Sequence, residues 1–274
     1  MAKISEEDRY QYFEKIKPYK LLIQYLLKRE KTVLDMIKIN SNGAAHKRLT
    51  MAEEMISLAS NYIVLCGVSQ AMLKLRSEEA LNDGRKSLYK AVIYLEEAVS
   101  PLIDEPFSEY EEKLAEIATV DAKRRYTIVR KFGLALQLLE DAYGSNTKWK
   151  WAFVELEGRY ATVAKNIIDL KAAVANTDPR SAEYEPTMLH LSLLKKLLLQ
   201  AADRYREKYE LSTNHTDDFK MGINYLNALK RIHIQLGERR ESELIRKKAL
   251  IWSSKLEVDI KKHEEKALKK TDNG

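Results

Sequence analysis

Apolar residues along the chain recur mostly at steps of three and four positions, the spacing that places side chains on one face of an α-helix. Short clusters of turn-forming residues, such as those at 40–43 and 176–179, separate these periodic stretches. The pattern therefore predicts eight helical stretches. They cover about residues 5–39, 44–75, 85–99, 108–143, 147–175, 186–211, 216–237 and 238–269.

Several of the predicted helices are about 30 residues long, which corresponds to about 45 Å of helix. Long helices joined by short loops pack as antiparallel hairpins. We therefore predict an all-α fold of seven to eight long helices in antiparallel hairpins, forming an elongated bundle or a short α-solenoid. Residues 1–274 are expected to form a single elongated domain, with candidate subdivisions at the breaks 100–108 and 176–186.

Two local signals refine the helix boundaries. Pro18 lies inside the first stretch, where a proline removes one backbone hydrogen bond, so we expect a kink or a break there. The tetrapeptide Ser108-Glu109-Tyr110-Glu111 fits a capping box, in which the serine oxygen and the glutamate bind free backbone N–H groups. It predicts that the fourth helix begins at Ser108.

Composition supports a helical chain and sets limits on its class. Nine Gly and five Pro among 274 residues are few, which favours an all-α fold. The net charge of +6, from 47 basic and 41 acidic residues, favours a solvated surface of mixed sign over a dedicated nucleic-acid domain. The single cysteine, Cys66, excludes an intrachain disulfide, and its apolar helical surroundings predict a small buried hydrophobic residue.

Signals for a membrane or for export are weak in this chain. No apolar run approaches the roughly 20 residues that a membrane span requires, so no membrane span is expected. The first residues are charged and lack the apolar core of a signal peptide. The default prediction is a cytoplasmic protein, although a secreted protein whose signal peptide had been removed would look the same.

The chain lacks the common sequence motifs of metal binding and catalysis. None of the five histidines has a carboxylate three residues before it, and no His-x-x-x-His occurs. Asp217 and Asp218 stand at a predicted helix start, where the helix dipole favours negative charge. No Gly-x-Ser-x-Gly elbow and no Gly-rich phosphate loop is present. We therefore expect a protein without catalytic activity, metal or cofactor.

The segment 223–250, INYLNALKRIHIQLGERRESELIRKKAL, contains Leu236-Gly237 at a turn and the late small-large pair Ala249-Leu250. In these positions it resembles a tetratricopeptide hairpin, and 85–99 resembles one more faintly. Ser242 stands where the family pattern has an alanine seven positions before Ala249. The resemblance implies a protein-binding scaffold. The alternative is that small residues seven apart simply allow two helices to approach closely.

Basic residues gather on two predicted helices. They are Lys123, Arg124 and Arg125 on the fourth helix, and Arg239, Arg240, Arg246, Lys247 and Lys248 on the eighth. Such faces could bind nucleic-acid phosphates or an anionic membrane. Interspersed carboxylates, as in the i,i+4 pair Glu243–Lys247, favour an ordinary solvated surface instead.

Aromatic residues offer a further signal. Fifteen Tyr stand against five Phe, and Tyr is enriched at interfaces, but it also suits boundary positions of long helices. Tyr205 and Tyr209 are four residues apart and share one helix face. Both interpretations stay open at this point.

The stretch TKWKWAFVEL at 147–156 contains two of the three tryptophans. Helical periodicity places Trp149 on an apolar face and predicts that it lies in the core. Trp151 lies about 200° away, on the same face as Gly158, so it is either covered by another helix or exposed. If exposed, Trp151 with Lys148 and Lys150, beside a notch at Gly158, would form a protein-binding hot spot.

Together these patterns indicate a non-enzymatic structural or protein–protein interaction protein. It would present helix faces to a partner or to copies of itself within a larger assembly. The alternative is a helical protein that binds nucleic acid or an anionic surface through its basic helix faces.

Overall fold

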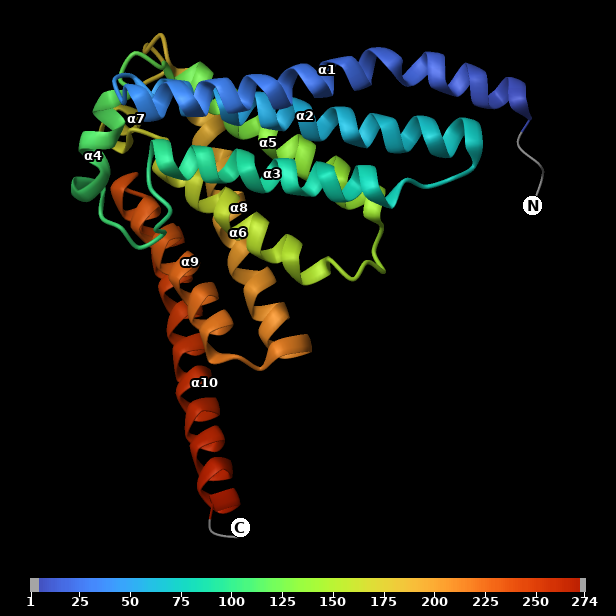
Figure 1. Ribbon diagram of the computed structural model, residues 1–274. Coiled ribbons are helices and arrows are strands. Elements are labelled where there is room, and N and C mark those ends of the chain that lie inside the picture. Colours follow the sequence, from blue (N-terminus) through green and yellow to red (C-terminus); the bar gives the residue numbers. More distant parts are fainter. Residues whose placement is uncertain (1–4, 272–274) are drawn as a thin grey trace. The chain divides into compact units, whose positions relative to one another are not determined.

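A computed structural model describes the backbone of residues 5–271 and the side chains of residues 5–262 (Figure 1). Helices and their connections make up all of this part of the chain, which contains no strand, so the prediction of an all-α fold is confirmed. The helices are α1 (Glu6–Ile39), α2 (Ala44–Leu73), α3 (Glu78–Ala98), α4 (Phe107–Glu116), α5 (Ala122–Tyr143), α6 (Lys150–Asn166), α7 (Leu170–Ala175), α8 (Tyr184–Lys208), the π-helical segment η1 (Tyr209–Thr213), α9 (Thr216–Gln235) and α10 (Arg239–Thr271).

The helices form two compact units, which are described separately. The N-terminal unit contains α1 to α5, and the C-terminal unit contains α6 to α10 together with the segment Leu102–Pro106. The candidate subdivision at 100–108 therefore overlaps a boundary between the units, whereas the one at 176–186 lies inside the C-terminal unit.

In the N-terminal unit, α2 is the central helix, and it packs along α3 and also against α1 and α5 (Figure 1). Met51, Met55 and Leu58 of α2 are fully buried, at the three- and four-residue spacing that the sequence shows. Leu81 and Leu88 of α3 are fully buried as well. Burial of such side chains stabilises the unit by about 1.5–3 kcal/mol each.

By length and composition alone, α2 could also cross a membrane. The core helix of a soluble protein passes the same test, and four other helices, α1, α3, α4 and α5, contact α2. Cys66 of α2 is buried, as predicted. The expectation that the chain has no membrane span stays a prediction.

In the C-terminal unit, α8, α9 and α10 pack side by side, with α9 in contact with both neighbours (Figure 1). Gly222 of α9 permits this packing, because a Cβ atom there would lie 3.0 Å from the carbonyl oxygen of Ala202 on α8. The turn between α9 and α10 contains Gly237 at φ +72°, a left-handed conformation that favours glycine. The hairpin of α9 and α10 covers the segment with the tetratricopeptide-like resemblance, which stays a prediction.

Several predicted boundaries differ from the structure. The third helix begins at Glu78, because the side chain of Ser77 accepts a hydrogen bond from the backbone N–H of Ala80 at 3.3 Å. Gly84, which precedes the predicted start of this helix at 85, lies inside α3 and is buried. A Cβ atom there would already lie 3.4 Å from Leu139 and 3.5 Å from the carbonyl oxygen of Ala59. Close packing therefore explains this glycine.

The predicted fourth and fifth helices are each interrupted. Ser108 lies inside α4 and does not cap it, since α4 begins at Phe107. The side chain of Asp121 instead starts a new helix, α5, by accepting a hydrogen bond from the N–H of Arg124 at 2.6 Å. Asp169 starts α7 in the same way, so the predicted continuous helices to Tyr143 and to 175 were wrong.

Of the kink or break predicted at Pro18, the break is absent, since α1 runs through this residue, and the kink stays a prediction. Pro18 is exposed, so the carbonyl group that loses its helical partner can be hydrated instead. The helix therefore tolerates the proline at the cost of one hydrogen bond.

Candidate docking surface

Trp149 lies just before α6 and is half-buried, so the prediction that it is a core residue was wrong. The guanidinium carbon of Arg85 lies 3.9 Å from the centroid of its ring, and the amine of Lys148 lies 5.3 Å from it. A cation over an aromatic face is a favourable arrangement at a half-exposed position. Trp149 is therefore held by charged neighbours of the N-terminal unit.

Gly158 does not leave a notch for a partner. It is buried in α6, and a Cβ atom there would lie 2.6 Å from Cε2 of Tyr205 and 2.8 Å from the hydroxyl of Tyr225. These two tyrosines fill the space, which contradicts the notch predicted beside Trp151. Trp151 itself is half-buried, as is Lys150, whereas Lys148 is exposed. The predicted hot spot thus lacks its pocket.

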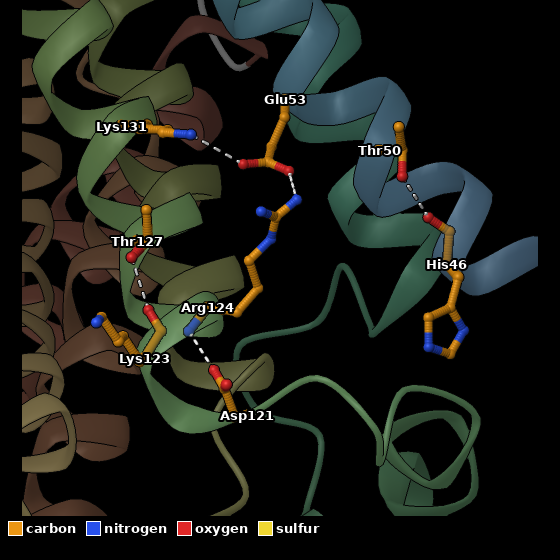
Figure 2. A network of polar contacts seen from close by, with 8 residues as sticks. All are labelled: His46, Thr50, Glu53, Asp121, Lys123, Arg124, Thr127 and Lys131. Carbon is orange, nitrogen blue, oxygen red and sulfur yellow. Dashed lines mark hydrogen bonds and ion pairs between the residues drawn. The ribbon is translucent and has the colours of Figure 1, made fainter. Parts of the chain in front are cut away.

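The basic face of α5 is partly neutralised by α2 (Figure 2). Glu53 of α2 pairs with both Arg124 and Lys131, the latter at 3.1 Å. Arg125 is buried and donates hydrogen bonds to the carbonyl oxygens of Ile117 at 3.0 Å and Val120 at 2.8 Å. Lys123 remains exposed. The prediction that Arg125 belongs to an exposed basic face was therefore wrong.

Beside this network, a cavity of about 380 Å³ lies between the start of α2 and the start of α5. Its wall includes His46, whose Nε2 lies 2.8 Å from Oγ1 of Thr119. Figure 2 shows that Asp121 and Arg124, which also line it, have partners within the unit. These groups satisfy one another, so they do not converge on a ligand. Across the described residues, no group of three His, Cys, Asp or Glu side chains could hold a metal ion.

The basic face of α10 is neutralised in part as well. Arg246 forms two contacts with Glu243 at 2.7 and 2.8 Å, and Lys248 pairs with Asp203 of α8 at 2.8 Å. Arg239, Arg240 and Lys247 are exposed. Arg246 is exposed as well, so four of the five cations of the predicted α10 face remain open to solvent.

A surface of a different kind lies on α1. Six of its large apolar side chains are more than half exposed. They are Tyr10 (65%), Phe13 (58%), Leu21 (61%), Tyr25 (57%), Met36 (52%) and Ile39 (86%). With 3.6 residues per turn, they fall within a sector of about 140°, which we call the outer face of α1. These six side chains give α1 an exposed apolar face along its length.

The opposite side of α1 fixes the helix to its own unit. Ile16, Ile23 and Leu26 are buried there, in a sector about 180° from the outer face. Glu30 is also buried, and it accepts hydrogen bonds from the hydroxyl of Tyr94 at 2.6 Å and the amine of Lys90 at 2.8 Å. Burial, together with the hydrogen bond to Glu30, raises the pKa of Tyr94, so its hydroxyl stays a donor. The inner face of α1 therefore packs against the rest of the N-terminal unit.

A family model described as the TP0443 family matches residues 8–260 of the chain. The chain belongs to the TP0443 family. No curated protein and no solved structure matches it. The residues matched include nearly all of α1, so the outer face lies within the family's common region.

Periodicity alone does not reveal the outer face in the sequence of this TP0443 family member. A helix with apolar residues on two opposite sides shows little contrast between its faces, so the pattern predicts the helix but not which side is exposed. The excess of Tyr over Phe does not identify this face either. Tyr10 and Tyr25 are exposed, whereas Tyr205 and Tyr209, whose spacing the sequence singled out, are buried.

Proposed function

We propose that this TP0443 family member is a non-enzymatic structural or interaction protein. It docks the outer face of α1 onto another component of a larger assembly. The observation that carries the proposal is the set of six apolar side chains, each more than half exposed, on the outward side of a helix whose inward side is buried. Leaving this much apolar surface in water is unfavourable by about 25 cal/mol for each Å², which a docked partner would recover.

The alternative, a nucleic-acid binder that uses the basic faces of α5 and α10, has less support. Glu53, Asp203 and Glu243 pair with several of the cations that it requires. Its remaining contacts would come from Lys123, Arg239, Arg240 and Lys247, which are exposed. On α10, the exposed Leu244, Ile251 and Val258 fall on the same side of the helix as Arg240 and Lys247.

Cysteine accessibility in cells tests the proposal directly. Cys66 is the single cysteine and is 3% exposed, so the natural protein provides the background of slow labelling. Leu21→Cys introduces a thiol on the outer face of α1. Leu134→Cys is the matched control, because Leu134 lies on α5 and is exposed by 59%, against 61% for Leu21. A water-soluble maleimide reports whether each thiol is reachable.

In the purified protein, both engineered thiols should be modified at similar rates. In cells that make the protein naturally, Leu21→Cys should be protected while Leu134→Cys is still modified. Equal modification of the two variants in cells would show that the outer face is not docked, and the proposal would fail.

A further inference from the structure

The outer face of α1 carries lysines as well as apolar side chains. Lys17, Lys28 and Lys31 fall in the same sector of the helix as Phe13 and Leu21. Lys20 lies at the edge of this sector, with its amine 5.8 Å from the centroid of the Phe13 ring. All four lysines are exposed. The central part of the face, at 13–31, is therefore both apolar and cationic over a length of about 27 Å.

Negative charge is nearly absent from this central part. The segment 13–31 contains two carboxylates, Glu14 and Glu30. Glu30 is buried on the inner side, where it pairs with Lys90. Glu14 lies 3.7 Å from the amine of Lys17, with both side chains more than half exposed. The face therefore keeps a clear positive charge and favours an anionic partner.

The shape of the outer face of α1 favours some classes of partner over others. A single helix presents a convex ridge, and neither of the cavities of about 380 and 500 Å³ lies on α1. A second copy of the chain would bring lysines against lysines. A bilayer interface, by contrast, deforms around a helix that lies flat on it, accepts apolar tips below the headgroups, and offers phosphates to lysine amines that extend outward.

We propose that the outer face of α1 docks on an anionic lipid bilayer. Phe13, Leu21 and Tyr25 enter the boundary between headgroups and acyl chains. Lys17, Lys20, Lys28 and Lys31 contact lipid phosphates. This inference rests on the proposed function, because it names the component on which α1 docks.

Flotation of the full-length protein with vesicles tests the inference. One set of vesicles contains phosphatidylglycerol mixed with phosphatidylcholine, and the other contains phosphatidylcholine alone. The apolar variant is Phe13→Ser with Leu21→Ser, and the charge variant is Lys17→Gln with Lys28→Gln. Matched controls on α5 are Leu134→Ser with Leu138→Ser, and Lys123→Gln with Arg130→Gln, all at exposed positions. Circular dichroism verifies that every variant keeps its helices.

The natural protein should bind the anionic vesicles at low salt, release them as salt rises, and ignore the neutral vesicles. The charge variant should bind about 25-fold more weakly, since each lysine near an anionic surface contributes about fivefold. The apolar variant should lose about tenfold or more. Both α5 controls should stay within about twofold of the natural protein.

Absence of binding at low salt would overturn the inference, as would equal binding to neutral vesicles or an equal loss in the α5 controls. The cysteine experiment then separates the two proposals. If vesicles do not bind but Leu21→Cys is protected in cells, a protein covers α1 and only the lipid inference fails. If Leu21→Cys is not protected, the proposed function fails as well.

Discussion

Gly158 lies at the centre of the C-terminal unit, where its lack of a side chain leaves room for two tyrosine rings. The rings of Tyr205 and Tyr225 stack over it with centroids 5.6 Å apart, one from α8 and the other from α9. The hydroxyl of Tyr225 lies 3.2 Å from Oγ1 of Thr162, which also donates to the carbonyl oxygen of Gly158 at 3.1 Å. Three helices thus meet at one glycine, and any side chain there must displace a buried ring.

Gly158→Ala should therefore lower the free energy of unfolding by about 1–2 kcal/mol, since the clash outweighs the gain in helix propensity. Gly67→Ala is the matched control. Gly67 also lies inside a helix, but a Cβ atom there meets nothing within 4 Å, so this change should raise the free energy of unfolding by about 0.5–1 kcal/mol. Urea unfolding followed by circular dichroism measures both. A gain in stability for Gly158→Ala would contradict the packing described.

Lys165 is a buried lysine that holds the segment Leu102–Pro106 to the C-terminal unit. Its amine donates to the carbonyl oxygen of Glu105 at 3.2 Å and to Oδ1 of Asn166 at 2.8 Å. Burial, followed by the nearby positive charge of Arg231, lowers the pKa of Lys165 from 10.5 to about 8. The sequence does not predict the burial of Lys165, because its neighbouring residues do not distinguish it from an exposed lysine.

The lowered pKa of Lys165 predicts a pH dependence with a definite sign. Between about pH 8 and 10.5, the unfolded chain keeps a proton that the folded chain has lost, so the contribution of Lys165 to stability rises with pH. The natural protein should therefore gain stability relative to Lys165→Met as the pH is raised through this window. Unfolding curves for both proteins at several pH values measure the difference. If the stabilities of the two proteins changed with pH in parallel, the pKa of Lys165 would not be lowered in the folded protein.

At the scale of elements, the start of α5 depends on one buried arginine. Arg125 binds two carbonyl oxygens, those of Ile117 and Val120, in the turn that separates α4 from α5. The carbonyl oxygen of Ile117 also accepts a hydrogen bond from the backbone N–H of Val120 at 3.0 Å, so Arg125 adds to the hydrogen bonding of this turn. The side chain of Arg125 therefore stabilises the turn through its hydrogen bonds, whereas the nearby Lys123 is exposed to solvent.

Arg125→Met should lower the free energy of unfolding by about 2–3 kcal/mol, because it removes two hydrogen bonds from a charged donor to the carbonyl oxygens of the turn. Lys123→Met, two positions away on the same helix, should change it by less than about 0.5 kcal/mol. Thermal or urea unfolding of both variants tests the contrast. If both substitutions changed the free energy of unfolding by equally small amounts, Arg125 would not stabilise the turn, and the exposed basic face that the sequence predicted would be supported.

The same two residues show how far the sequence can predict this structure. Periodicity predicts that α2, α5 and α9 exist, because their apolar spacing depends on local pattern alone. It does not separate Arg125 from Lys123, since the difference depends on a turn that brings distant carbonyl groups within reach. It also misplaced the start of α3, because Gly84 lies in a tight helix contact that only the tertiary structure shows. Charged and small residues thus acquire their roles from packing.

For the molecule as a whole, the account rests on the contrast between the two sides of α1. The inner side packs on its own unit through Ile16, Ile23 and Leu26, while the outer face leaves six large apolar side chains in solvent. The proposed function gives this outer face a role, because a docked partner would cover its apolar side chains. No chemistry at a pocket is required for this role.

The comparison of Leu21→Cys with Leu134→Cys in cells tests this central claim most directly. The two positions are almost equally exposed in the isolated protein, so any difference in maleimide labelling inside cells comes from what covers α1. The account predicts that labelling of Leu21→Cys is slowed severalfold relative to Leu134→Cys in cells, and that the difference disappears after purification. Identical labelling of both positions in cells would contradict it.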